Sequence, residues 1–386
     1  MVYVNGINVF LPNEPVFNDQ IENVLGVVPG SATKARRLVL RNNGIEARYY
    51  AINRETGKPT HSNSELSAVA VRGLLAKNDL QGNEVDLLAC GTSGPDQLFP
   101  SHAAMVHGEL GIDPCEVLSV SGVCGSSVGA LKYAYLYLQA NPDKQAVVTG
   151  SEIASKYLRS ENFLNSKEPT DELVEAEPNQ GFGQHFLRWM LSDGAAALLL
   201  QGRPNKNRPS LKIEWIDSIS YANEMPTCMY AGCLKKNDGS TQSWLDVDRN
   251  HLSSTGVMNI AQDVQLLNEH IVEYVICKAF AKIAEKRELK PSDIDFFVPH
   301  YSSKYFKPRV YDGLTRIGFE IPYEKWFTNL TEKGNVGSAS IFISLEGLMT
   351  SGKLEHGQKI LCFVPESSRF SVSYFYLTVI DGDEGV

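Results

Sequence analysis

Residues 80–93, LQGNEVDLLACGTS, have the pattern of a helix end, a short turn and a buried strand. Residues 289–302, LKPSDIDFFVPHYS, align with them without gaps and show the same polar turn before an apolar run. Near-continuous apolar strands that alternate with helices are typical of a sheet covered on both faces. The two stretches therefore predict an α/β chain in which one structural unit occurs twice.

The internal repeat continues downstream in the same order. Three further pairs of segments match: residues 117–130 with 326–345, residues 145–152 with 358–366, and residues 193–200 with 370–377. Cys124 and Asn335 therefore begin equivalent helices, and each half is predicted to run strand, helix, strand, helix, strand, strand. We place the N-terminal half at residues 1–205 and the C-terminal half at residues 206–386.

Size and composition indicate a globular protein. The chain has 386 residues, of which 43% are hydrophobic and 21% charged. Its formal charge of −9 argues against nucleic acid as a partner, because phosphate contacts need a basic surface. No apolar run approaches the ~20 residues that span a bilayer, and the N-terminus does not resemble a secretory signal. We expect a cytoplasmic protein with no membrane span.

The cysteines give no sign of a disulfide framework or a metal site. There are seven, an odd number, and none forms a CxxC pair. Cys228 and Cys233 are the closest in sequence, but no nearby pair of histidines or cysteines completes a zinc site. We therefore predict reduced cysteines and no bound metal.

Cys124 is the strongest candidate for a reactive residue. Residues 117–130, VLSVSGVCGSSVGA, pass from a strand through small residues into a helix. The N–H groups at a helix N-terminus stabilise a thiolate, so we expect the pKa of Cys124 to be lowered towards ~7 or below. The surrounding glycines leave room for a carbonyl group to approach. Taken alone, Cys124 could equally be a small buried core residue.

Three motifs on the repeat resemble those of the thiolase-like condensing enzymes, and within them the β-ketoacyl-acyl-carrier-protein synthase III family. The motifs are SGVCGS at residues 121–126, VPHYSS at residues 298–303 and GNVGSAS at residues 334–340. The resemblance covers nearly the whole chain and implies a five-layered αβαβα fold. It also implies a catalytic triad of Cys124, His300 and Asn335 and a homodimer.

The proposed triad also makes chemical sense. A thiolate can attack an acyl thioester and become acylated, and a second thioester must then react as an enolate. His300 and Asn335 can each donate a hydrogen bond to the enolate oxygen, worth ~3 kcal/mol each in the transition state. Taken singly, His300 could be a structural histidine and Asn335 a helix cap. The expected oxyanion hole is formed by the backbone N–H groups of Cys124 and Ser368.

The chain departs from the family pattern at two places. Residues 364–370, VPESSRF, stand where the family has a glycine-rich loop, and Tyr301-Ser302-Ser303 replace glutamine-alanine-asparagine after the histidine. The pattern is more similar to the ketosynthase/cyclase branch that makes dialkylresorcinol or stilbene precursors. That branch joins a β-ketoacyl thioester to an α,β-unsaturated acyl unit and closes a 1,3-cyclohexanedione ring. Glu152 is the candidate base for ring closure; its alternative role is structural.

The resemblance also indicates substrates and partners. It implies acyl-CoA and acyl-carrier-protein substrates, and no cofactor beyond the coenzyme A or phosphopantetheine that these substrates carry. The expected substrate-binding residues are Arg41, Phe99 and Ser93. Carrier proteins are acidic, so positive charge near the active site is expected to dock them. The candidates for docking, which could also be a merely solvated helix face, are Lys304, Lys307 and Arg309.

Two segments lie outside the repeat. The acidic residues 167–178 are predicted to be a solvated loop or a cap over a substrate tunnel, and residues 220–256 a long irregular excursion.

Three other functions compete with the ketosynthase/cyclase interpretation. The first is a simple β-ketoacyl synthase III, which condenses acyl-CoA with malonyl-carrier protein without cyclisation. The others are a cysteine-dependent thioester hydrolase and a catalytically inactive partner subunit.

Overall fold

The computed structural model describes residues 1–28, 33–163 and 185–382; the acidic segment at residues 167–178 lies outside them. Within the described ranges, nine strands form one mixed sheet in the order β13-β14-β15-β8-β1-β7-β6-β4-β5. The strands are β1 (Tyr3–Phe10), β4 (Leu87–Thr92), β5 (Glu116–Ser121), β6 (Gln145–Glu152), β7 (Gly194–Gln201), β8 (Ser210–Ser220), β13 (Phe296–Pro299), β14 (Lys359–Glu366) and β15 (Ser371–Ile380).

The sheet repeats the same strand order on both sides of its centre. From the centre outward, one half runs β1-β7-β6-β4-β5 and the other runs β8-β15-β14-β13. In each half the pair nearest the centre is antiparallel, the next pair is antiparallel, and the following pair is parallel. A short antiparallel pairing of β1 with β8 joins the halves. The predicted repeat is confirmed, while the division into two domains at residues 205 and 206 stays a prediction.

One predicted strand, at residues 326–330, is reduced to a single bridge. It should stand beside β13 as β5 stands beside β4, but only Trp326 pairs with Phe297, in parallel. Side chains hold this segment in place of a ladder. The Trp326 ring packs against Phe297 at 4.9 Å and its indole N–H donates to the Ile321 carbonyl at 2.8 Å. The chain then turns directly into α12 (Leu330–Lys333).

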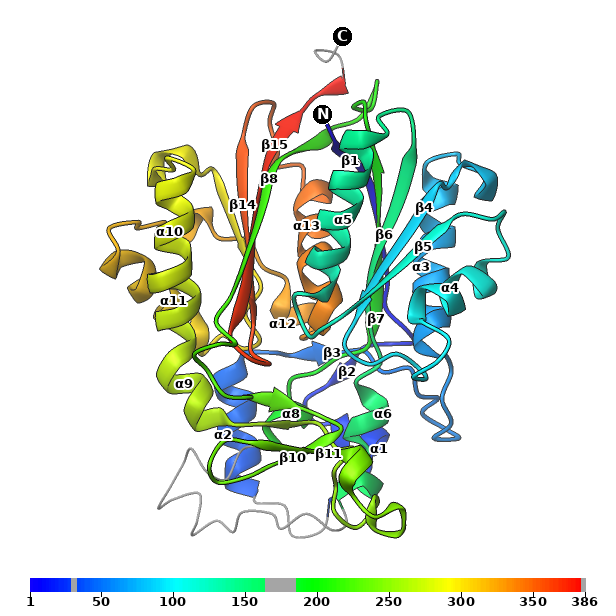
Figure 1. The fold of residues 1–386 in the computed structure, drawn as a ribbon, viewed down its shortest axis with the longest axis vertical. Helices are drawn as coiled ribbons and strands as arrows, with labels where there is room; N and C mark the ends of the chain where they lie inside the picture. The colour runs from blue at the N-terminus through cyan, green and yellow to red at the C-terminus, as the bar shows by residue number, and fades with distance from the viewer. Residues whose placement is uncertain (29–32, 164–184, 383–386) are drawn as a thin grey trace.

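Helices complete a five-layered α-β-α-β-α architecture, in which α5 and α13 lie side by side in the central layer (Figure 1). Helices α3 and α4 cover the outer face of the first half-sheet, and α9, the π-helix η5, α10 and α11 cover that of the second. Their bounds are α3 (Asn63–Lys77), α4 (His102–Leu110), α5 (Ser126–Ala140), α9 (Val264–Val272), η5 (Glu273–Lys278), α10 (Ala279–Lys286), α11 (Phe306–Arg316) and α13 (Ser340–Thr350). The thiolase-like α/β fold is confirmed.

The two halves share one buried core. Val128 and Leu131 of α5 pack in one cluster with Ile341 and Phe342 of α13, and all four are at most 1% exposed. Burying such side chains stabilises the fold by about 1.5–3 kcal/mol each. The central helices therefore hold both half-sheets at a fixed distance from each other.

Short elements form a cap below the strand ends (Figure 1). They are β2 (Val16–Phe17), α1 (Ile21–Leu25), α2 (Thr33–Asn43), β3 (Ala47–Arg48), α6 (Ser155–Leu158), α8 (His185–Arg188), β9 (Met229–Tyr230), β10 (Cys233–Lys235), β11 (Thr241–Ser243) and β12 (Ala261–Gln262). The predicted excursion at residues 220–256 supplies three of these strands, β9, β10 and β11. The cap closes over the edge of the sheet at which polar side chains collect.

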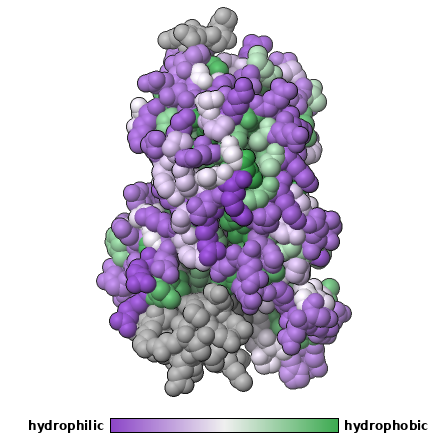
Figure 2. All heavy atoms as spheres, turned by 90° about the vertical axis from the view of Figure 1, so that its left-hand side faces the viewer, coloured by the Kyte–Doolittle hydropathy of each residue, from purple (hydrophilic) through white to green (hydrophobic). Residues whose placement is uncertain are grey.

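Viewed from the side of α9, α10 and α11, the surface is largely hydrophilic with narrow apolar strips (Figure 2). Across the described ranges, no helix is both long and apolar enough to cross a bilayer. All seven cysteines lie in these ranges and are free. Nor do three or more His, Cys, Asp or Glu side chains of the described residues form a group that could hold a metal ion.

Candidate active site

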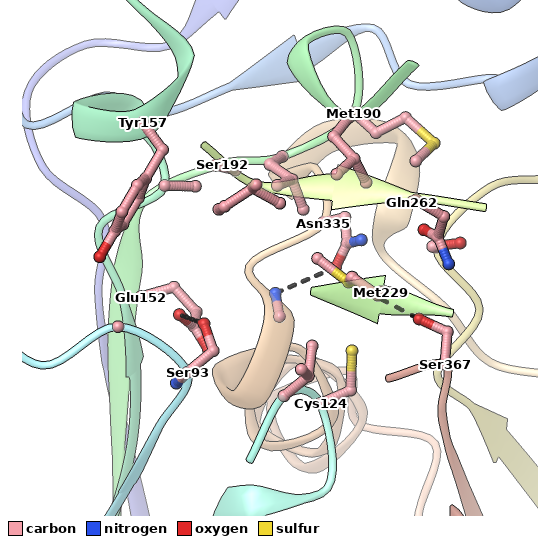
Figure 3. Close-up of a pocket in the computed structure, with 18 of the residues that line it drawn as sticks. Ser93, Cys124, Glu152, Tyr157, Met190, Ser192, Met229, Gln262, Asn335 and Ser367 are labelled. Carbon is pink, nitrogen blue, oxygen red and sulfur yellow. Dashed lines mark hydrogen bonds between the residues drawn. The ribbon is translucent and has the colours of Figure 1, made fainter. Parts of the chain in front are cut away.

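Two cavities meet at Cys124. The first contains about 600 Å³ of empty space and the second about 500 Å³. Cys124, Ser302 and Ser367 line both of them. The first cavity lies under the cap and carries the polar side chains drawn in Figure 3. A substrate bound in either cavity can therefore reach the same sulfur.

Cys124 lies in the tight loop between β5 and α5. The helix begins two residues later, at Ser126, whose backbone N–H and hydroxyl both donate to the Val123 carbonyl at 3.3 and 2.9 Å. Gly125 is the N-cap residue, and a Cβ there would come within 2.8 Å of the Glu366 carboxylate. The predicted place of Cys124 in a strand-to-helix turn is confirmed.

Glu366, the last residue of β14, places its carboxylate against this loop. Oε2 accepts hydrogen bonds from the backbone N–H groups of Val123 at 3.1 Å and Gly125 at 2.9 Å. The Ser368 hydroxyl donates to Oε1 at 2.7 Å. Because the N-cap residue of α5 is a glycine with no side chain to cap the helix, Glu366 supplies the anion at this helix N-terminus.

The expectation that the helix N-terminus lowers the pKa of Cys124 is wrong for the free protein. Burial, followed by the negative charges of Glu366 and Glu152, raises the pKa of this thiol above its usual range. Cys124 is only 9% exposed, and the N–H groups on either side of it already bind Glu366. In this state Cys124 is a neutral thiol.

Glu152, the last residue of β6, lies in the first cavity with its carboxylate turned towards Ser93 (Figure 3). Ser93 donates its backbone N–H to Oε1 at 3.2 Å and its hydroxyl to Oε2. The Ser338 N–H also donates to Oε1, at 3.2 Å. Burial raises the pKa of Glu152 to about 7, although these donors oppose the rise. A carboxyl group with this pKa can exchange a proton near neutral pH.

Asn335 contributes an oriented amide to the first cavity. Its backbone forms a parallel bridge with Leu191, since the Asn335 carbonyl accepts from the Ser192 N–H at 2.8 Å. Its side-chain Oδ1 accepts from the Gly337 N–H at 3.0 Å and the Ser340 hydroxyl at 3.4 Å. Because these contacts hold the oxygen, the NH₂ end is turned away from them, into the cavity (Figure 3).

His300 follows β13 directly and lines the second cavity. Its backbone N–H donates to the Phe363 carbonyl at 2.8 Å, which continues the pairing of β13 with β14. Burial lowers the pKa of His300 to about 4. The ring is therefore neutral at pH 7 and carries one N–H donor. Cys124 follows β5, His300 follows β13 and Asn335 follows α12; Cys124 lines both cavities, with Asn335 in the first and His300 in the second.

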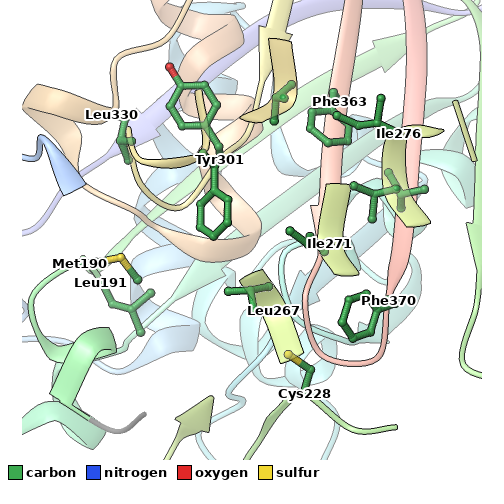
Figure 4. Close-up of a cluster of buried hydrophobic side chains, with 14 of the residues drawn as sticks. Met190, Leu191, Cys228, Leu267, Ile271, Ile276, Tyr301, Leu330, Phe363 and Phe370 are labelled. Carbon is green, nitrogen blue, oxygen red and sulfur yellow. The ribbon is translucent and has the colours of Figure 1, made fainter. Parts of the chain in front are cut away.

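The second cavity is lined mainly by apolar side chains from the helical layer and the sheet. They include Leu267 and Ile271 of α9, Phe306 of α11 and Phe363 of β14. Figure 4 shows how the side chains of α9 and β14 approach each other beside Tyr301, with the cap residues on the other side. This lining suits a hydrocarbon chain and offers few polar partners.

Comparisons with known proteins place the chain among condensing enzymes. Residues 284–364 match the family described as 3-Oxoacyl-[acyl-carrier-protein (ACP)] synthase III C terminal. The chain is 25% identical to a β-ketoacyl-[acyl-carrier-protein] synthase III of Hyphomonas neptunium, over 93% of each protein. It is 24% identical to the enzyme of that name from Clostridium perfringens, over 92% of this chain and 93% of the relative. The chain is therefore similar to the β-ketoacyl-acyl-carrier-protein synthase III enzymes over nearly its whole length.

Solved structures agree with the ketosynthase III fold. AbyA1, a tetronic acid condensing enzyme, superimposes with a TM-score of 0.75 over 98% of this chain and all of its own, at 19% identity. A variant of Xanthomonas campestris OleA, determined with bound lauric acid and lauroyl-CoA, gives 0.72 over 98% of both chains, also at 19% identity. At these identities the likeness shows the fold. Together with the curated relatives, it indicates a condensing enzyme similar to β-ketoacyl-[acyl-carrier-protein] synthase III.

The three predicted substrate-binding residues lie in different parts of the structure. Ser93 lies in the first cavity, bound to Glu152. Arg41 is exposed in the last turn of α2, and Phe99 is 88% exposed in the loop before α4. Neither side chain lines the two cavities at Cys124. Their contact with substrate stays a prediction.

The proposed oxyanion-hole residue Ser368 faces the cap. Its carbonyl accepts from the N–H groups of Cys228 at 2.8 Å and Met229 at 3.2 Å, and its hydroxyl binds Glu366. Ser367, its neighbour, lines both cavities. The role of the Ser368 N–H stays a prediction.

The three predicted docking residues differ in their surroundings. Lys304 is exposed. The Lys307 ammonium lies 4.5 Å from the centre of the Tyr323 ring, and the Arg309 guanidinium lies 4.4 Å from that of Tyr305. Cation–π contacts of this kind leave the positive charge at the surface but restrict the side chain. A role in docking stays a prediction for all three.

Three residues at Cys124 were not expected from the sequence: Glu366, Ser302 and Ser367. A signal for Glu366 existed, because the repeat aligns residues 145–152 with residues 358–366 and both segments end in glutamate. The two serines carry no such signal. They lie at Cys124 only because β13 and β14 end beside each other.

Proposed function

We propose that this condensing enzyme is a ketosynthase/cyclase. It joins an α,β-unsaturated acyl unit, held on Cys124, to a β-ketoacyl-carrier protein and closes a 1,3-cyclohexanedione ring. The product is the precursor of a dialkylresorcinol or stilbene. The observation that carries this proposal is Glu152, a buried carboxyl group with a pKa near neutrality in the same cavity as Cys124 and Asn335.

The first step is acylation. Cys124 attacks the thioester carbonyl, a new bond forms between Sγ and the acyl carbon, and the bond to the carrier sulfur breaks. The thiol proton of Cys124 ends on the departing sulfur. The acyl chain fits the apolar second cavity, whose walls include Leu267, Ile271 and Phe306. Forming the acyl-enzyme splits a difficult carbon–carbon bond formation into two easier steps.

Condensation follows when the second thioester reacts as an enolate. Asn335 donates from its NH₂ group and the neutral His300 donates from its ring N–H to the enolate oxygen. The new carbon–carbon bond forms at the acyl carbon, and the Cys124 thiol is released. The Asn335 amide is held by buried hydrogen bonds before substrate arrives, so little reorganisation of this donor is needed.

Ring closure requires one more proton transfer. The CH₂ group on the far side of the ketone of the β-ketoacyl unit must lose a proton before it can attack the unsaturated carbon of the new chain. The new carbon–carbon bond closes a six-membered ring, and the carbon next to the other carbonyl group takes up a proton. Ionised Glu152 is the base that accepts this proton, since its pKa of about 7 makes it half ionised near neutral pH. Ser93 and Ser338 hold the carboxylate towards the first cavity.

The substitution Glu152→Gln tests the cyclase proposal. We expect acylation of Cys124 to stay within about twofold and the cyclic product to fall ~100-fold, because a positioned general base contributes roughly 10²–10⁴. A linear condensed product should accumulate. Intact-protein mass gives the acyl-enzyme, and chromatography with mass detection gives the two products. Equal loss of acylation and cyclisation would contradict the proposal.

The pH dependence of cyclisation provides the matched control. In the wild-type protein the rate of ring closure should rise with pH through about 7, as Glu152 loses its proton. Ser93→Ala keeps the carboxylate but removes a hydrogen bond that lowers its pKa. The profile of Ser93→Ala should therefore shift to higher pH. If only linear ketoacyl products form at every pH, the enzyme is a simple condensing enzyme; if no acyl-enzyme forms, it is an inactive partner subunit.

We also propose that two copies of the chain form a homodimer through the β5 edge of the sheet. This strand has no neighbour on its outer side among the described residues, and an open edge with apolar side chains favours pairing. Val117 on β5 is 38% exposed and Leu136 on α5 is 53% exposed. Phe99, exposed on the same chain, reaches a substrate only in the cavity of a partner subunit.

Light scattering after gel filtration checks the dimer. The wild-type protein should have twice the chain mass of 42.6 kDa. Val117→Asp introduces a charge on the exposed edge and should give a monomer, since burying an unpaired carboxylate is costly. A wild-type mass equal to one chain would refute the dimer.

A further inference from the structure

Two equivalent glutamates each bind the active-site loop of the opposite half of the molecule. Glu152 ends β6 in the first half and accepts the Ser338 N–H from the loop after Asn335 in the second. Glu366 ends β14 in the second half and accepts the Val123 and Gly125 N–H groups from the Cys124 loop in the first. The proposed function uses Glu152 as a base and leaves Glu366 without a role.

Close packing shows that both contacts are built into the fold. A Cβ added to Gly337 would come within 2.8 Å of Glu152 Cγ, and a Cβ added to Gly125 would come within 2.8 Å of Glu366 Oε2. Neither loop could carry a larger residue at its glycine without displacing the carboxylate. Gly337 also has φ +49°, a left-handed conformation that favours glycine.

Glu366 occupies the N-terminus of α5, where the backbone N–H groups were expected to stabilise the Cys124 thiolate. It accepts the N–H of the N-cap residue Gly125 and that of Val123, and the Ser368 hydroxyl gives its carboxylate a third donor. All three contacts direct N–H or O–H donors at this carboxylate. A negative charge at this place opposes a second negative charge on the sulfur of Cys124.

We propose that Glu366 is a positioning residue that fixes the Cys124 loop and, by holding a negative charge at the N-terminus of α5, keeps Cys124 as a neutral thiol until an acyl thioester binds. The proposal rests on the proposed function of Cys124 as the acylated residue. Acylation then proceeds with the proton passing from Cys124 to the departing sulfur, so no free thiolate accumulates in the resting enzyme. The consequence is a buried thiol that resists alkylation and oxidation between turnovers.

Apart from Glu152, the other titratable groups that line the cavities at Cys124 change charge outside the range of pH 6 to 10. The remaining titratable side chains that line the two cavities come from β6, from α6 and from the segment after β13, and are Glu152, Tyr157, His300 and Tyr301. Burial lowers the pKa of His300 to about 4, raises that of Tyr157 and raises that of Tyr301 to about 12. Glu152 alone has a pKa near 7.

The test is the alkylation of Cys124 by iodoacetamide between pH 6 and 10, followed by peptide mass. This assay measures the reactivity of the Cys124 thiol and does not depend on condensation. It therefore tests the role of Glu366 even if the proposed ketosynthase/cyclase function is wrong. Glu366→Gln keeps the size of the side chain and a hydrogen-bond acceptor but removes the charge. We expect its alkylation midpoint to fall by at least one pH unit, which corresponds to about tenfold faster alkylation at pH 7.5. An unchanged midpoint would overturn the proposal.

Three comparisons isolate the charge of Glu366. Glu332→Gln removes an exposed carboxylate elsewhere and should leave the midpoint unchanged. Glu152→Gln should lower it by less than Glu366→Gln, because Glu152 contributes less to the rise of the thiol pKa. The wild-type midpoint gives an independent check if Glu366→Gln does not fold. A wild-type value near 7, below the ~8.5 of a free thiol, would also overturn the proposal.

Discussion

Cys124→Ala is expected to abolish the acyl-enzyme and to lower condensation by roughly 10⁴-fold or more, because removing a nucleophile forfeits the covalent route entirely. Cys124 lines both cavities and lies in the loop bound by Glu366. Intact-protein mass after incubation with an α,β-unsaturated acyl thioester measures the acyl-enzyme, and product release measures turnover. The fold should persist, because Glu366 binds the backbone N–H groups of Val123 and Gly125 and not the side chain of Cys124.

A second cysteine provides the control for this experiment. Cys115 is free, half-buried and outside both cavities, so Cys115→Ala should acylate and turn over like the wild-type protein. Acylation that survives in Cys124→Ala and disappears in Cys115→Ala would show that another thiol is the nucleophile. The same mass spectra locate the acyl group on a peptide, which makes the assignment direct.

Loss of the amide donor of Asn335 should have the second-largest effect. Asn335→Asp keeps Oδ1 as an acceptor for the Gly337 N–H and the Ser340 hydroxyl but replaces the NH₂ donor with a second oxygen. We expect condensation to fall about 10²–10³-fold, the range measured when one oxyanion donor is removed. Acylation of Cys124 should change by only a few fold, because the enolate forms after that step.

His300→Ala extends the same argument. We expect condensation to fall by a similar factor and the double variant with Asn335→Asp to fall by less than the product of the two, since both donors serve one oxygen. Burial lowers the pKa of His300 to about 4, so the ring stays neutral from pH 5 to 9 and should add no step to the pH profile there. Rapid-quench measurement of condensation from a preformed acyl-enzyme separates these effects from acylation. If acylation and condensation fall equally, the two residues act on Cys124 and not on an enolate.

The fold could be predicted because its signal is periodic and repeated. Four segment pairs predict the same succession of strands and helices in both halves, and β4 and β13 appear where the paired stretches place them. The exception is the strand expected at residues 326–330. Its apolar side chains fit a strand or a packed loop equally well, and the contact of Trp326 with Phe297 favours the loop.

The sequence singled out four residues that line the two cavities, Cys124, His300, Asn335 and Glu152, but not the electrostatics around them. Cys124, His300 and Asn335 were found from motifs at equivalent positions of the repeat, and Glu152 from its place after a strand. The direction of the thiol pKa was wrong, because Glu366 lies 243 residues from Val123 in sequence and yet binds the backbone on both sides of Cys124. Sequence position alone does not report which anion occupies a helix N-terminus.

By itself, the sequence determined a duplicated α/β chain with a cysteine, a histidine and an asparagine in the loops that follow its repeated elements. That much follows because hydrophobic periodicity and local turn residues are properties of neighbouring positions along the chain. The tertiary structure alone decided that two cavities share Cys124, that Glu152 is buried beside Ser93, and that Glu366 binds the Cys124 loop. Burial and charge act through space, so the protonation states that set the chemistry depend on contacts between residues far apart in the chain.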